Sequence, residues 1–234
     1  LLYVNLALAG TSGDLKQEFN NGGTALFTPS YQNDQFQKTL SLPDGKFLLL
    51  STKGENGPMA YTGYIARMNA DGTPDQGFGY GGGTTYMAAS QLESTLPRYM
   101  AIAPGGKIVI AGMITAPDMD MFIVQLNSDG TFDTTFNHSG LLILNNSNIY
   151  TEIPGGLVVQ SDGKIVVANN AADNTSSSLL LSRINPDGTF DLQYGFFGIN
   201  ILAETGKSYN VVELVNDEIS GHIVAMGGSK DNGT

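Results

Sequence analysis

A repeat with a period of roughly 58 residues runs through the chain and constrains its fold more than any other feature. One motif, Asn-x-Asp-Gly-Thr-x-Asp, occurs three times at a constant spacing; its copies are Asn69–Asp75, Asn127–Asp133 and Asn185–Asp191. A second motif, a turn followed by Gly-Lys and a hydrophobic run, recurs upstream at nearly the same spacing, around Lys46, Lys107 and Lys164. Two independent motifs that share one period indicate a repeat architecture, in which each unit packs against its neighbours.

The two termini carry the remaining copy, divided between them. His222 lies one period after Lys164 in a Gly-His-Ile-Val run, and Phe19 lies nearly one period before Phe78 in an aromatic-glycine segment. The chain therefore reads as a circle of four repeats cut within one of them, which predicts a closed ring. We expect a single domain over residues 1–234, with repeats at about 41–98, 99–156 and 157–210 and a fourth made of 211–234 with 1–40.

Each repeat contains four short runs that are rich in β-branched residues and bounded by Gly, Pro, Asn or Asp. In one repeat these runs are 99–102, 107–111, 122–126 and 141–144. The pattern is typical of antiparallel hairpins, and the 30 glycines of the chain fit frequent turns. Four strands per repeat in a ring predict an all-β fold, a four-bladed β-propeller with about 58 residues per blade. One blade would be completed by both termini, from 211–228 with 2–8 and 25–28.

The pattern Pro-Asp-Gly-Lys-Ile-Val-Val-Ala-Gly, a variable loop, Leu-Asn-Pro-Asp-Gly-Thr-Phe-Asp and an aromatic-glycine run resembles the bacterial delta-60 repeat family. The resemblance is clearest over 42–82, 101–140 and 159–198. It is weaker in the terminal repeat, where Gly10, Ser12 and Lys16 replace the Asn and the two Asp. It implies a β-propeller in a secreted, periplasmic or cell-surface bacterial protein. The family brings no established catalytic residues, so the resemblance supports a fold and not an activity.

Composition excludes several functional classes. The chain has 11 Lys and Arg against 22 Asp and Glu, a net charge of −11, whereas nucleic acids and anionic membranes attract clustered basic residues. We therefore expect no nucleic-acid partner, and no membrane insertion, because no apolar run reaches the ~18 residues that a spanning helix needs. The absence of Cys excludes disulfides and thiolate metal sites, and the two histidines form no zinc motif.

The Asn-x-Asp-Gly-Thr-x-Asp motif has two interpretations. Its oxygen-bearing residues resemble part of a calcium loop; the candidate ligands are Asn69, Asp71, Asp75, Asn127, Asp129, Asp133, Asn185, Asp187 and Asp191. The acid that completes such a loop is missing, because Tyr80, His138 and Phe196 occupy its position. The alternative is structural: Asn and Asp cap the turn and the glycine takes a positive φ. We favour the structural interpretation, and calcium is the one cofactor that we consider.

The segment between the second and third strands differs in every repeat, although the turns around it are nearly constant. A variable loop on a constant scaffold is typical of a binding surface, and neutral drift is the alternative. The candidate binding residues in these loops are Glu55, Asn56, Asp118, Asp120, Asp173, Asn174, Lys230 and Asp231. Such side chains suit a polar ligand, a glycan or another protein.

The sequence thus predicts a non-catalytic binding or scaffold module and assigns no catalytic residue. Two alternatives stay open. Loop carboxylates that converge over one face are also the groups that a propeller-type polysaccharide hydrolase or lyase would use. The repeats are equally compatible with a purely structural segment of a larger surface protein.

Overall fold

The computed structural model describes residues 4–7, 19–22, 24–27, 35–54, 61–80, 84–86, 94–115, 119–144, 151–172, 177–203, 207–217 and 220–231. Their secondary structure consists of β-strands and two short 3-10 turns, η1 (Phe19–Asn21) and η2 (Pro104–Gly106). The predicted all-β class is confirmed. None of these described segments contains a helix long and apolar enough to cross a membrane.

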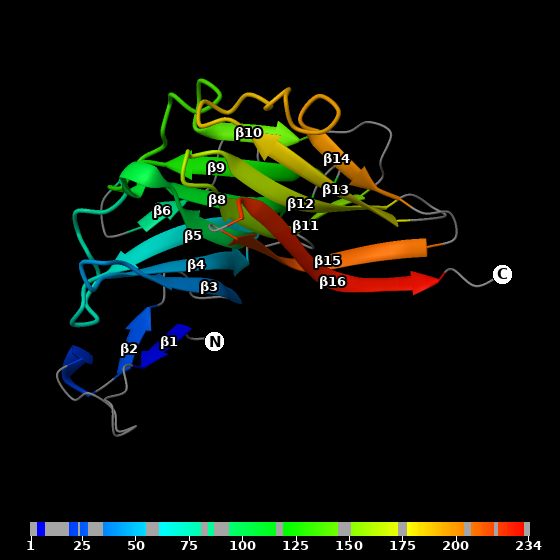
Figure 1. Cartoon of the computed structure of the whole chain (residues 1–234). Helices are drawn as coiled ribbons and strands as arrows, with labels where there is room; N and C mark the ends of the chain where they lie inside the picture. Colours follow the sequence, from blue (N-terminus) through cyan, green and yellow to red (C-terminus); the bar gives the residue numbers. More distant parts are fainter. Residues whose placement is uncertain are drawn as a thin grey trace. The chain divides into compact units, whose positions relative to one another are not determined.

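Two sheets each contain four antiparallel strands that follow one another along the chain (Figure 1). The strands of the first are β3 (Gln35–Ser41), β4 (Phe47–Gly54), β5 (Tyr61–Met68) and β6 (Thr84–Tyr86). Those of the second are β7 (Thr95–Ile102), β8 (Ile108–Ile114), β9 (Met121–Leu126) and β10 (Leu141–Leu144). The four runs predicted for this repeat are therefore confirmed as strands, and they pair as the consecutive hairpins that the turn residues indicate.

A third set of four antiparallel strands begins at the next repeat. It consists of β11 (Thr151–Val159), β12 (Ile165–Ala172), β13 (Ser177–Ile184) and β14 (Ile199–Leu202). The last two strands, β15 (Lys207–Asp217) and β16 (His222–Asp231), form a long antiparallel hairpin. One parallel bridge, between Ser177 and Ser208, joins this hairpin to β13, and β16 is the last strand in the order of the sheet.

The N-terminal segment contains a separate two-stranded sheet. Its strands, β1 (Val4–Ala7) and β2 (Thr24–Phe27), are antiparallel, in agreement with the strand expected near the start of the chain. The sequence also predicts that this pair completes the sheet of β15 and β16. In the described residues the two hairpins belong to separate sheets, and no sheet closes on itself. The four-blade count and the closure by both termini therefore remain predictions.

The chain divides into two compact units, 1–97 with 129–131 and 98–128 with 132–234. The core of the first unit centres on Phe19, Leu49, Tyr64, Ala66 and Met68. The described residues of the second unit include one cluster around Ile123, Phe136 and Ile165 and another around Val166, Leu179 and Leu214. Every residue of β8 and β9 is buried, because both faces of the sheet are covered, and this explains their nearly continuous apolar sequences.

Candidate functional site

A pocket of about 210 Å³ lies in the second unit, and strands β10 to β14 supply most of its walls. The apolar lining residues are Ile143, Leu144, Leu180, Phe190 and Ile199. Three polar residues join them, Glu152 from β11, Asn169 from β12 and Ser182 from β13. A mostly apolar hollow with a few convergent polar groups is the usual form of a small-molecule site.

Glu152 is the most unusual group in this pocket, because its side chain is charged at neutral pH in most proteins and here is almost fully buried. Only 3% of Glu152 is exposed. Its backbone N–H donates to the carbonyl oxygen of Met119 at 2.9 Å, which fixes the start of β11 beside the segment that leads into β9. Burial raises the pKa of Glu152 to about 7; the backbone N–H of Met121 lowers it, the charge of Asp120 raises it, and Asn169 lowers it.

Two oxygen atoms in the pocket have no hydrogen-bond partner among the described residues. They are Oε2 of Glu152 and Oδ1 of Asn169, on residues that are 3% and 4% exposed. A buried acceptor without a donor costs about 1–3 kcal/mol, so native proteins leave few of them. Both atoms belong to residues that line the same pocket, so this region presents acceptors that a donor from a bound molecule would satisfy.

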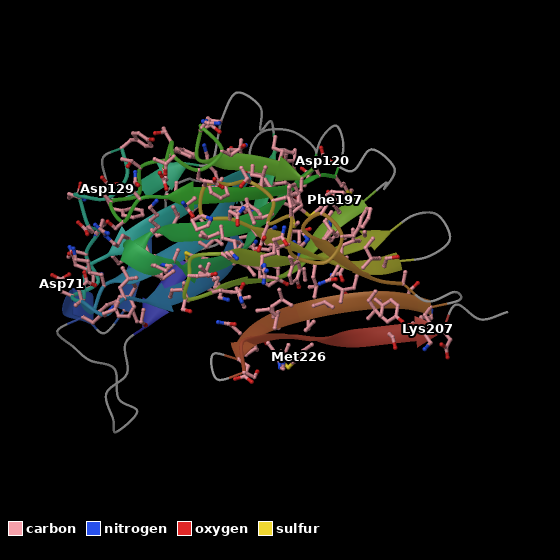
Figure 2. The ribbon with its side chains drawn as sticks, turned by 45° about the horizontal axis from the view of Figure 1, so that its top comes forward. Asp71, Asp120, Asp129, Phe197, Lys207 and Met226 are labelled. Carbon is pink, nitrogen blue, oxygen red and sulfur yellow. The ribbon has the colours of Figure 1, made fainter. Side chains whose placement is uncertain are left out.

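Of the predicted loop residues, only Asp120, Lys230 and Asp231 fall in the described segments; Glu55, Asn56, Asp118, Asp173 and Asn174 lie outside them. Asp120 precedes β9, and its carbonyl oxygen accepts a hydrogen bond from the N–H of Ile114 at 2.8 Å. Lys230 and Asp231 belong to strand β16 itself, where Asp231 faces Lys207 across the hairpin. In Figure 2 Lys207, the residue that faces Asp231, is well separated from Asp120, and the convergence of the predicted loop residues stays a prediction.

Glu152 is absent from the predicted site residues, although the repeat contains a signal for it. Thr95 stands about one period earlier, at the corresponding start of β7, and its Oγ1 accepts a hydrogen bond from the N–H of Gly63 at 2.8 Å. Glu152 likewise faces the N–H of Met121, which stands one period after Gly63. The signal in the sequence is therefore an acid inside a strand at a position where another repeat has threonine. A comparison of the repeats at this position would have identified Glu152.

The last aspartate of each repeated motif joins the two motifs of its own repeat through an ion pair. Oδ2 of Asp75 accepts hydrogen bonds from Lys46 Nζ and Arg67 Nε, each at 2.7 Å. Its Oδ1 accepts a third from the N–H of Gly77 at 3.1 Å. The hydrogen bond from Lys46, together with that from Arg67, lowers the pKa of Asp75 to about 2 although burial opposes the shift.

The same arrangement recurs in the two following repeats. Asp133 accepts from Lys107 Nζ at 2.6 Å, and neutral Gln125 replaces the arginine at 2.8 Å. Burial would raise the pKa of Asp133, but the hydrogen bonds from Lys107, Thr135 and Gln125 outweigh it and lower the pKa. Asp191 pairs with Lys164 and Arg183 at 3.1 and 2.8 Å. The two motifs share a period because each lysine is the partner of the aspartate that follows it.

The first aspartate of the motif shapes the turn. Oδ1 of Asp71 accepts hydrogen bonds from the N–H and the hydroxyl of Thr73, at 2.9 and 2.7 Å. Asp129 and Asp187 repeat both contacts with Thr131 and Thr189 at the same distances; Asp71 and Asp129, both in the first unit, lie on the same side of it in Figure 2. The intervening glycines all have a φ near +85°, which a side chain disfavours.

Two of these three networks lie in segments that match a known family. Residues 104–136 and 160–194 match a family described as a domain of unknown function (DUF5122) beta-propeller. Two segments of the chain thus resemble β-propeller repeats. Each runs from the turn before Lys107 or Lys164 to the aromatic residue Phe136 or Tyr194, so each contains one complete lysine–aspartate network. The match supports a β-propeller repeat family, and comparison with curated proteins gave no match.

The hydrogen bonds of the motif aspartates bear on the interpretation of the motif as a calcium site. In each motif the carboxylate oxygens of the last aspartate already accept hydrogen bonds from cationic or amide groups, and those of the first accept from threonine. The described residues contain no group of three or more His, Asp and Glu side chains placed to hold a metal ion. These contacts agree with the structural interpretation of the motif, and calcium binding stays a prediction.

Proposed function

We propose that the protein is a four-bladed β-propeller of delta-60-type repeats that acts as a non-catalytic binding or scaffold module outside the bacterial cytoplasm. Its ligand is a polar molecule, a glycan or another protein. The observation that carries the proposal is the contrast between the lysine–aspartate framework, which recurs in three repeats, and the loops between the second and third strands, whose sequences differ in every repeat. A constant framework that carries a variable surface is expected of a recognition scaffold.

A repeated contact between successive repeats supports the ring. The residue after each aromatic donates its N–H to the carbonyl oxygen of the first aspartate in the next repeat, at 2.7 Å each time; the pairs are Asn20 with Asp71, Gly79 with Asp129, and Asn137 with Asp187. The next donor in this series is Gly195, and the repeat spacing makes Ser12 the acceptor. That fourth contact would join the last full repeat to the N-terminal segment and close the ring.

The composite blade follows from the same spacing. β1 and β2 correspond to β9 and β10, because Phe19 and Phe136 precede the second strand of each pair by the same number of residues. β15 and β16 correspond to β7 and β8, of which β8 pairs with β9 in the second sheet. Pairing of β16 with β1 would supply the missing ladder and leave no unpaired strand at the join.

The ligand face proposed here carries the loops between the second and third strands. Asp120, at the end of one such loop, stands close enough to Glu152 for its charge to raise the pKa of that acid. The other three loops are also rich in Asn, Ser, Thr, Asp and Lys. Polar side chains of this kind form adaptable hydrogen bonds with hydroxyl-rich or polypeptide ligands.

A binding array tests the function. Glycan and protein arrays would be probed with the labelled protein and with a variant in which Glu55, Asp118, Asp173 and Asp231 are replaced by alanine. We expect binding to at least one ligand that the quadruple variant loses without a change in Tm. A control variant, Asp44→Ala with Asp162→Ala, removes two exposed acids from turns and should keep binding.

Two results would overturn the proposal. Equal array binding by the wild type and the quadruple variant would exclude the loops as the contact surface. Release of reducing ends from pooled polysaccharides by the wild-type protein would identify a hydrolase instead of a binding module.

A further inference from the structure

We propose that the pocket lined by Glu152 and Asn169 binds a small organic ammonium ion with a compact apolar body. The inference extends the proposed binding function to a second site, in the second unit. It rests on that function only in assigning ligand binding to the protein, since it uses none of the variable-loop residues as direct contacts. The ligand class follows from the hydrogen-bonding groups, the walls and the charge of the pocket.

The buried oxygen atoms of the pocket require a ligand that donates hydrogen bonds. Oε2 of Glu152 and Oδ1 of Asn169 are acceptors without a partner in the described residues, and both residues are more than nine-tenths buried. Ser182, which is 5% exposed, adds a hydroxyl to the same lining. An ammonium group has three N–H donors and no acceptor, so one such group can serve both orphan oxygens and the hydroxyl.

The walls set the size and the character of the rest of the molecule. Leu144, Leu180 and Phe190 are three of the five apolar side chains around the polar groups. A volume of about 210 Å³ corresponds to roughly seven non-hydrogen atoms, taking about 30 Å³ for each water-sized group. A branched or cyclic hydrocarbon of this size would replace water against these walls and gain the hydrophobic contribution.

The charges around the pocket favour a cation. None of the described residues that line it is Lys, Arg or His. The groups that face Glu152 are Asp120, from the segment before β9, the N–H of Met121 on β9 and the side chain of Asn169 on β12. Glu152 in the lining and Asp120 beside it, with no basic side chain among the described lining residues, give a negative potential, which attracts an ammonium ion and repels a carboxylate or phosphate.

The acid also makes binding depend on pH. Burial holds the pKa of Glu152 near 7 in the unliganded protein, so most of the protein carries the protonated acid at pH 6 and the carboxylate at pH 8. An alkylammonium ion keeps its charge over this range and pairs with the carboxylate. Its affinity should therefore rise about tenfold between pH 6 and pH 8, in step with the ionised fraction of Glu152.

Methyl NMR titration with cyclohexylammonium chloride tests the proposal, with cyclohexanol as the neutral probe of equal size. We expect saturable shifts of the Ile143 and Ile199 methyl groups by the ammonium ion at pH 8, with a Kd on the order of 1 mM. Cyclohexanol should bind at least about tenfold more weakly. The variant Glu152→Gln should lose this preference and its pH dependence, whereas the exposed control Glu213→Gln should keep both.

A second variant separates binding in the pocket from contact elsewhere. Leu180→Phe keeps Glu152 but fills the hollow, and it should abolish the methyl shifts for both probes. Absence of saturable shifts in the wild type, equal affinity for the two probes, or unchanged ammonium binding in Glu152→Gln would each overturn the proposal. The quadruple loop variant should retain ammonium binding while it loses array ligands, so the failure of one proposal is distinguishable from the failure of the other.

Discussion

The backbone N–H of Asn137 donates a hydrogen bond to the carbonyl oxygen of Asp187, in the next repeat, at 2.7 Å. Asn137 has a φ of 44° and follows the fully buried Phe136, so the chain turns sharply beneath the aspartate–glycine turn of the next repeat. Because the contact uses only backbone atoms, it recurs where the donor is Asn20 or Gly79. In each case the hydrogen bond runs from the residue after the aromatic of one repeat to the Asn-x-Asp-Gly-Thr-x-Asp motif of the next repeat.

The first prediction concerns the closure of the ring. By the register of β8 with β9, in which Ile110 faces Val124, the equivalent partners across the join are Ala225 and Ala7. The chain has no Cys, so the double variant Ala7→Cys with Ala225→Cys has one defined pair. We expect an intramolecular disulfide, seen as a mobility change on a non-reducing gel, because facing residues of paired strands lie within disulfide reach.

The matched control for this prediction places one cysteine out of register. Ala7→Cys with Ser220→Cys puts the second thiol in the turn before β16 and should stay reduced under the same conditions. Equal oxidation of the two pairs, or none in either, would contradict pairing of β16 with β1.

The second prediction concerns Gly130, in the turn of the second motif copy. Its φ is +87°, and a Cβ at this position would meet the ring of Phe78 at 2.7 Å. Gly105 has a similar φ of +77° but nothing within 4 Å of a Cβ. Gly130→Ala should therefore cost about 1–3 kcal/mol more than Gly105→Ala, which bears only the backbone strain. Urea unfolding of both variants measures the difference, and equal losses would exclude close packing as the reason for glycine.

The third prediction compares the two aspartates of one motif. Asp133 is 3% exposed and accepts from Lys107, Gln125 and Thr135, so Asp133→Asn removes the charge that these donors share. We expect a loss of about 2–3 kcal/mol in the free energy of unfolding. Asp129→Asn, at the exposed turn, should cost less than about 1 kcal/mol. A reversed order in urea unfolding would refute the framework role of the last aspartate.

The fourth prediction concerns the pH dependence of stability. The pKa of Glu152 is raised to about 7 in the folded protein, so folding binds a proton, and stability falls as the pH rises from about 4.5 to above 7. Glu152→Gln cannot ionise, and its amide can donate to Asn169. The variant should match the wild type near pH 4.5 and exceed it at pH 8 by on the order of 2–3 kcal/mol.

Thermal unfolding across this pH range measures the effect, and the exposed acid Glu213, changed to Gln, serves as the control. If the difference in Tm between the wild type and Glu152→Gln does not change from pH 4.5 to pH 8, then Glu152 titrates in its ordinary range.

The sequence by itself determined the repeat, the all-β class and the role of the turns. These depend on local chemistry: glycine where φ is positive, Asp and Thr that bond within one turn, and apolar runs long enough for one strand. The lysine–aspartate pairs were present in the sequence as two motifs with one period, although their contact was not evident until the hairpin brought Lys107 and Asp133 together.

Only the tertiary structure decided the burial of Glu152 and its place in a pocket. The pKa of an acid depends on which strands cover it, and the lining of this pocket comes from residues 143–199, which are brought together by sheet packing. Local composition around Glu152 is ordinary for a strand, so only the comparison with Thr95 in another repeat distinguishes the position. Asp120 was predicted as a polar loop residue, and the fold gave it a more specific role, because it places that charge beside the one buried acid among the described pocket residues.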